Sequence, residues 1–325
     1  MHKKRKYNDL VADEEKQNDE DRLKRAVRDG DETMVRRLVK GGVLVNPKSR
    51  QWFGGTILHD AIASGKVSIV KLLLQAKADV NATTQDNRTC LHVAARTGYS
   101  GNTEIVKELL KSGADVNIQT KDKRTALHFA TWRGNKDIVQ QLVDNGANVN
   151  LLDEDMWSPL YWAAKLNYLE IAKILVGNGA CLNCVNSMEM SPLHEVLKNG
   201  HIELAKFLIT EGAFVSGHKK EVFQLLASNK DIKTEDRICL CETFIQAGYH
   251  IRNSLPHLLS SKPNIDMELI KFVQRQHLEV LTLKSLCRIC IRHRLTEVTK
   301  GCSVRRKISE LPLPKLLQEY VSFDR

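Results

Sequence analysis

The string Thr125-Ala126-Leu127-His128 decides the fold of this chain, because near copies of it recur along the sequence. The other copies are Thr56-Ile57-Leu58-His59, Thr89-Cys90-Leu91-His92, Ser158-Pro159-Leu160-Tyr161 and Ser191-Pro192-Leu193-His194. Successive copies begin 33, 36, 33 and 33 residues apart, and the long step holds three additional residues near Tyr99-Ser100-Gly101. A fixed period of this length predicts an architecture of stacked repeats.

Each copy has the chemistry of a helix start. Threonine or serine in the first position can accept a hydrogen bond from a backbone N–H two or three residues later. Proline in the second position loses nothing, because that N–H has no partner inside the helix. The glycines at 65, 98, 134 and 200 are predicted to end the first helix of their repeats in the left-handed conformation.

A second helix in each repeat is predicted from apolar residues at helical spacing, such as Ile138, Val139, Leu142 and Val143. A hairpin string of the type Gly113-Ala114-Asp115-Val116-Asn117 then keeps the same period. One such helix pair is too small to bury its apolar stripe, so neighbouring pairs must stack. These residues resemble the ankyrin repeat, with its period of about 33 and its T-P-L-H-x-A signature. The expected fold is therefore dominated by α-helices: an ankyrin-repeat solenoid of helix pairs joined by hairpin loops.

The recurring histidines are predicted to be structural. One active site would not reappear every 33 residues at the same helical position, and the fourth copy has Tyr161 in its place. We expect His59, His92, His128 and His194 to hydrogen-bond near the helix start, as the partner residue of a capping box does.

The last forty-five residues have a different pattern. Leu283, Leu286, Cys287, Cys290 and Ile291 form one apolar face of a helix, and Lys284, Arg288 and Arg292 mark its opposite side. Leu311-Pro312-Leu313-Pro314 then precedes a second short helix. A segment this short cannot build a stable core of its own, so it must pack on the repeats, on a partner, or on both.

The string Thr282-Leu283-Lys284-Ser285-Leu286-Cys287-Arg288-Ile289-Cys290-Ile291 resembles an elongin-binding box, and Leu311-Pro312-Leu313-Pro314 resembles a cullin-5 box. Together they resemble a SOCS box, and this resemblance implies a segment of three helices. The whole chain is similar to the ankyrin repeat and SOCS box family. The expected organisation is a tail over residues 1–20, an N-terminal capping repeat over 21–53, five ankyrin repeats over 54–216, degenerate repeats over 217–280 and the SOCS box over 281–325.

This resemblance implies a substrate receptor of a cullin–RING ubiquitin ligase that performs no bond chemistry itself. Elongin C, paired with elongin B, would receive Leu283, Leu286, Cys287 and Ile291 in a groove. Cullin-5 with its RING subunit would contact Leu311, Pro312, Leu313 and Pro314. The alternative, from another class, is an ankyrin scaffold for protein interactions without a ligase.

The charge distribution argues against nucleic acid as the main partner. The net charge is +10, but residues 51–280 hold 25 basic and 25 acidic side chains, so the excess lies at the two ends. A phosphate backbone would need a basic face along the body. No segment has the length of a membrane helix, and eight scattered cysteines fit a reducing compartment. The expected location is the cytoplasm, and the run Lys3-Lys4-Arg5-Lys6 leaves the nucleus open.

A target-binding surface is expected in repeats three and four, where aromatic and charged residues fall at positions that are normally exposed. Trp132 aligns with Ala63 and Lys165, and an aromatic ring at such a position indicates a contact site. Trp162 aligns with Val93 and Phe129 and is expected in the core. The candidate target-binding residues are Trp132, Arg133, Asp153, Asp155, Trp157 and Lys165.

No cofactor is expected. Cys181-x-x-Cys184 and Cys287-x-x-Cys290 have the spacing of half a zinc site each, but the first pair falls in a hairpin and the second on the helix of the elongin box. The sequence contains no phosphate-binding loop, no zinc-protease motif and no nucleophile elbow. An enzyme is therefore not the favoured interpretation.

Overall fold

The computed structural model describes residues 19–46, 54–98, 101–213, 226, 229 and 232–247. The chain divides into two compact units, residues 1–148 and 149–325. The described secondary structure is mainly helical in both units, and Thr83 and Thr89 form an isolated antiparallel bridge in the first. The whole predicted SOCS box lies outside the described residues, as do residues 217–225 and 248–280 of the predicted degenerate repeats.

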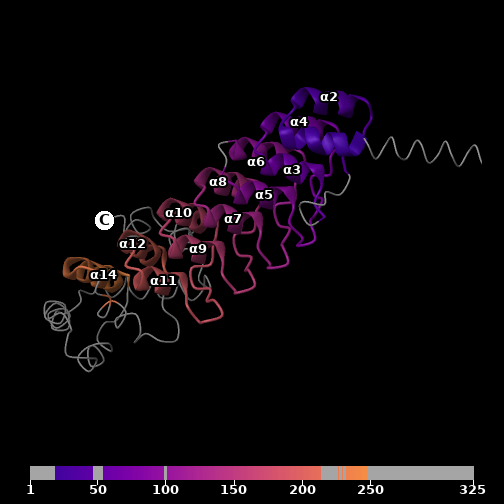
Figure 1. The fold of residues 1–325 in the computed structure, drawn as a ribbon. Helices are drawn as coiled ribbons and strands as arrows, with labels where there is room; N and C mark the ends of the chain where they lie inside the picture. Colours follow the sequence, from indigo (N-terminus) through magenta and orange to yellow (C-terminus); the bar gives the residue numbers. More distant parts are fainter. Residues whose placement is uncertain are drawn as a thin grey trace, which may run out of the picture. The chain divides into compact units, whose positions relative to one another are not determined.

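The first unit is built from helix pairs that pack in two rows. Residues 19–29 are helical and precede α2 (Glu32–Lys40). The three helices α3 (Ile57–Ala63), α5 (Cys90–Arg96) and α7 (Ala126–Trp132) pack in sequence against one another. A second row consists of α2, α4 (Val67–Gln75), α6 (Asn102–Lys111) and α8 (Lys136–Asp144), as Figure 1 shows. This is the predicted ankyrin arrangement of stacked helix pairs.

The second unit repeats the pattern. The helix α9 (Pro159–Lys165) packs on α10 (Leu169–Gly177) and on α11 (Pro192–Lys198). Helix α12 (Ile202–Glu211) packs on α10, α11 and α14 (Thr234–Gln246). Phe244 lies buried in the last turns of α14, within the segment where degenerate repeats are predicted.

The core consists of the apolar residues that the repeat period selected. Leu58, Leu91 and Leu127, the third residue of each copy in the first unit, are all buried. Leu160 and Leu193 are buried at the same position in the second unit. Burial of one such leucine contributes on the order of 2 kcal/mol, so the stack depends on contacts between neighbouring repeats.

Hairpin asparagines connect successive repeats through hydrogen bonds. The side-chain oxygen of Asn81 accepts from the backbone N–H of Asp115 at 2.9 Å, and its amide nitrogen donates to the carbonyl of Gly113 at 3.1 Å. Asn117 makes the same two contacts, with the N–H of Asn148 and the carbonyl of Gly146. These asparagines therefore fix the spacing between hairpins as well as the geometry of their own turns.

One predicted helix end is wrong. Gly65, Gly134 and Gly200 have φ angles of 69°, 70° and 72° in the left-handed region. Gly98 is not among the left-handed glycines, because α5 ends at Arg96 and the next residue, Thr97, is extended. The residues at the position of Thr97 in two other repeats, Ser64 and Arg133, are still helical in conformation, so there the chain leaves the helix only at the glycine.

Candidate functional site

The recurring histidines form capping boxes and are not arranged as a catalytic site. In α5 the backbone N–H of Thr89 donates to Nδ1 of His92 at 3.0 Å, which leaves the ring proton on Nε2. That Nε2 lies 3.2 Å from the carbonyl of Arg124, in the next repeat. The same boxes occur at His59, His128 and His194. The prediction of a structural role is confirmed.

Burial of these rings changes their protonation. Desolvation, together with the nearby charges of Arg88 and His128, lowers the pKa of His92 to about 4, although its backbone hydrogen bonds act in the opposite direction. Desolvation also lowers the pKa of His59. Both rings are therefore neutral at pH 7, as acceptance of a backbone N–H by Nδ1 requires.

The first unit carries two of the predicted target-binding residues, and both are exposed. Trp132, at the end of α7, has 45% of its surface accessible. The guanidinium carbon of Arg133 lies 5.7 Å from the centroid of the Trp132 ring. A methyl group placed on Gly98 would collide with the guanidinium of Arg133, so the missing side chain at 98 leaves room for that arginine.

The second unit carries the other four predicted target-binding residues. For one of them, Asp153, the predicted contact with a target is wrong. The Asp153 carboxylate is buried, and it accepts from the backbone N–H groups of Asp155 and Trp157 at 3.1 and 2.8 Å. It also accepts from Nε1 of Trp162 at 3.4 Å. Asp153 thus holds its own hairpin together and is not presented to a partner, whereas the side chain of Asp155 is exposed.

Trp157 and Trp162 form an aromatic pair beside Lys165. Their ring centroids lie 4.6 Å apart, and the Lys165 Nζ lies 4.2 Å from the centroid of Trp157. Trp162 is half-buried, so its expected place in the core is wrong. The indole needs a partner for its N–H and reaches Asp153 by staying at the edge of the core.

Three features of the structure were not predicted. Methionines Met156 and Met188 are exposed at hairpin tips in the second unit. In the same unit the hydroxyl of Tyr161, whose pKa is raised by burial and by its contact with Glu195, donates to that carboxylate at 2.9 Å. The exposure of Met156 could have been predicted from the sequence, since this residue occupies a turn-tip position in the repeat register. The contact of Tyr161 could not, because its partner comes from the next repeat.

The cysteine pairs divide between described and undescribed residues. Cys181 and Cys184 are joined in a disulfide, which the scattered cysteine pattern did not predict. Cys287 and Cys290 lie outside the described residues, as do all eight predicted elongin- and cullin-binding residues. In the part of the chain that the structure describes, no three histidine, cysteine, aspartate or glutamate side chains lie close enough together to hold a metal ion.

The described helices include none that is long and apolar enough to cross a membrane. Two family profiles match the chain. Ankyrin repeats (three copies) match residues 23–120, 91–186 and 127–218, and a SOCS box matches residues 279–322. No curated protein matches the sequence.

Proposed function

Because the chain belongs to the ankyrin repeat and SOCS box family, we propose that it is the substrate-recognition subunit of an elongin B/C–cullin-5 ubiquitin ligase. Ankyrin repeats bind proteins, a SOCS box implies an adaptor role toward elongins B and C and a cullin, and neither module is catalytic. The observation that carries the proposal is the order of the two modules: an array of protein-binding repeats followed by a C-terminal SOCS box at residues 279–322.

In this proposal the elongin contact is made by a single helix. Leu283, Cys287 and Ile291 are spaced four residues apart, so they lie along one face of a helix, and Leu286 is next to them on that face. Lys284 and Arg288 fall on the opposite face, where they can stay in water. This pattern suits a helix that inserts into an apolar groove of elongin C.

The ligase raises the local concentration of ubiquitin at the target. The repeat array holds the target, the SOCS box holds the elongins and cullin-5, and target lysines then meet the ubiquitin thioester in one assembly. The proposed outcome is ubiquitination of the target and its degradation by the proteasome. We propose that this activity takes place in the cytoplasm, and the basic run Lys3-Lys4-Arg5-Lys6 leaves the nucleus open as a second location.

Co-purification tests the proposal against the alternative of a scaffold without a ligase. We expect the full chain, expressed together with elongins B and C, to elute as one complex with both, and to bind cullin-5 with its RING subunit when these are added. A scaffold would elute without the elongins. Proximity labelling with the intact chain and with a chain lacking residues 281–325 would then identify targets whose abundance depends on the SOCS box.

Replacing Leu311, Pro312, Leu313 and Pro314 by alanine separates the two ligase contacts. We expect cullin-5 binding to fall at least about tenfold, because loss of two prolines and two leucines removes both a fixed backbone and apolar contact area. Elongin binding should be unchanged, since the elongin helix lies some twenty residues earlier. Isothermal titration of the purified elongin complex with cullin-5 measures the effect, and equal loss of elongins would contradict the assignment.

A further inference from the structure

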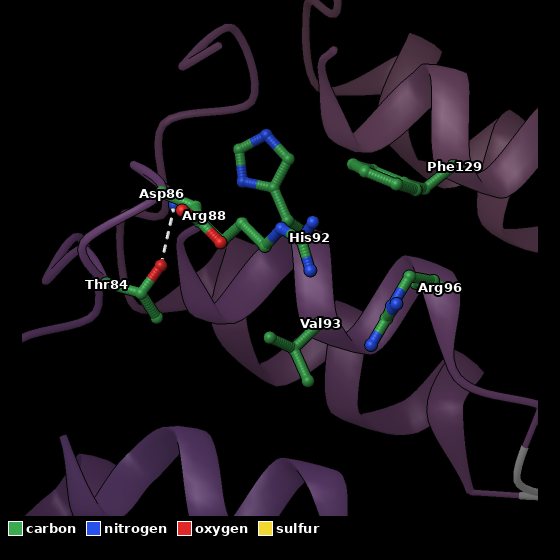
Figure 2. Close-up of a pocket in the computed structure, with 7 residues that line it drawn as sticks. All are labelled: Thr84, Asp86, Arg88, His92, Val93, Arg96 and Phe129. Carbon is green, nitrogen blue, oxygen red and sulfur yellow. Dashed lines mark hydrogen bonds between the residues drawn. The ribbon is translucent and has the colours of Figure 1, made fainter. Parts of the chain in front are cut away.

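Three arginines from two neighbouring repeats approach one another on the first unit. Arg88 lies just before α5, Arg96 is the last residue of α5, and Arg133 follows α7. Figure 2 shows Arg88 and Arg96 at the rim of a pocket. The pocket is lined by Thr84, Asp86, Arg88, His92, Val93, Arg96 and Phe129.

These charges are not compensated within the described part of the chain. No described carboxylate forms an ion pair with Arg88, Arg96 or Arg133. The Nε of Arg88 is buried and makes no hydrogen bond to a described residue. Burial, and then the charges of Arg88 and Arg133, lower the pKa of Arg96. Asp86, which is exposed, is the one acidic residue among the seven that line the pocket.

Aromatic rings border the same charges. Phe129 closes one side of the pocket (Figure 2). Its ring packs edge to face against the His92 ring, and the two ring centroids lie 5.9 Å apart. Trp132 projects into solvent beside Arg133. Tryptophan and arginine are both enriched among the residues that contribute most to protein–protein binding energies. Uncompensated guanidinium groups favour carboxylates, which they can bind through two parallel hydrogen bonds.

The geometry points to a binding site for an acidic peptide segment, formed by Arg88, Arg96, Arg133 and Trp132, with an aspartate or glutamate side chain of the ligand at the pocket. This inference rests on the proposed function, because it assigns to the target an acidic segment that the repeats recognise. The ligand is a protein segment and not a nucleic acid, since the balanced charge of residues 51–280 provides no basic face long enough to follow a phosphate backbone.

Fluorescence anisotropy with a defined probe tests the site on the full chain. The probe is a fluorescein-labelled twelve-residue peptide with four glutamates and two aspartates, separated by leucine and serine. One matched control carries glutamine and asparagine in place of the acids. A second control carries the same amides and also phosphoserine in place of the serines. We expect the acidic peptide to bind at least tenfold more tightly than the amide peptide, and less tightly as salt rises.

Two double variants locate the binding. The variant Arg88→Gln with Arg96→Gln should bind the acidic peptide at least tenfold more weakly. The variant Trp132→Ala with Arg133→Gln should show the same loss of affinity, and because both of its residues are exposed, the substitutions should not disturb the fold. Lys107→Gln with Lys111→Gln on α6 removes the same charge elsewhere in the unit and should change the affinity less than twofold. Thermal unfolding of each variant verifies that the fold is kept.

Equal binding by all variants, or equal weakening by the lysine pair, would overturn the site. A phosphoserine peptide that binds tenfold more tightly than the acidic one would overturn the assignment to carboxylates. Elongin capture is measured on the same preparations. Retained capture without peptide binding contradicts this inference alone, whereas lost capture contradicts the proposed function and leaves the peptide result to be judged by itself.

Discussion

Replacing Leu283 and Cys287 by aspartate is expected to abolish capture of elongins B and C. In the proposed complex both side chains enter an apolar groove, and each aspartate would place a carboxylate there without a partner. An unpaired charge in such a site costs at least about 3 kcal/mol. Capture should therefore fall by at least about a hundredfold. Quantitative pull-down of elongin C by the tagged full chain measures the loss.

The matched control puts the same two carboxylates on the other side of the helix. Lys284→Asp with Arg288→Asp should keep elongin capture within about threefold, because those positions lie on the charged face. The repeat array should unfold at the same temperature in both variants. Capture that persists in the Leu283 and Cys287 variant, or is lost equally in the control, would refute the assignment of the apolar face.

Acidification is expected to destabilise the first unit through His92. The folded ring has a pKa of about 4, whereas a histidine in the unfolded chain titrates near its ordinary value of 6.5. Between these two pH values the unfolded chain binds more protons, so the stabilising contribution is complete above about pH 6.5 and is lost as the pH falls to about 4. The free energy of unfolding should drop by about 3 kcal/mol from this residue alone.

His92→Gln isolates that contribution. Glutamine can still accept the backbone N–H of Thr89, as glutamine does in a capping box, but it does not titrate. Urea unfolding gives the free energy of unfolding of both proteins at pH 7 and at pH 4. The decrease in this free energy between the two pH values should be smaller by about 3 kcal/mol in the variant, because carboxylates titrate equally in both proteins. Parallel pH profiles for the two proteins would contradict this account of His92.

The sequence predicted what local chemistry determines. Thr89 and His92 are three residues apart, so their capping box follows from spacing alone, and Leu91 and Leu127 are buried because the period sets their face. The expectation for Gly98 was wrong because the chain already becomes extended at Thr97, before the glycine. The expectation for Asp153 was wrong because a side chain that caps its own hairpin has the same residue type as one that faces a partner.

The candidate surface on the first unit depended on stacking and could not be predicted. Arg88 and Arg96 are eight residues apart, and Arg133 lies thirty-seven residues beyond Arg96. Only the packing of α5 against α7 brings the three together. Trp132 was predicted from its place in the repeat, since an aromatic ring stands where Ala63 and Lys165 stand in other repeats, but nothing in the spacing indicated which charges would surround it.

Hydrogen–deuterium exchange tests most directly whether the C-terminal helix is the docking site for the elongins. The full chain is measured alone and after addition of elongins B and C. The account predicts that backbone amides of residues 282–292 exchange at least about tenfold more slowly in the complex, with no change in α5 and α7. Unchanged exchange over residues 282–292 when elongins are present would contradict it.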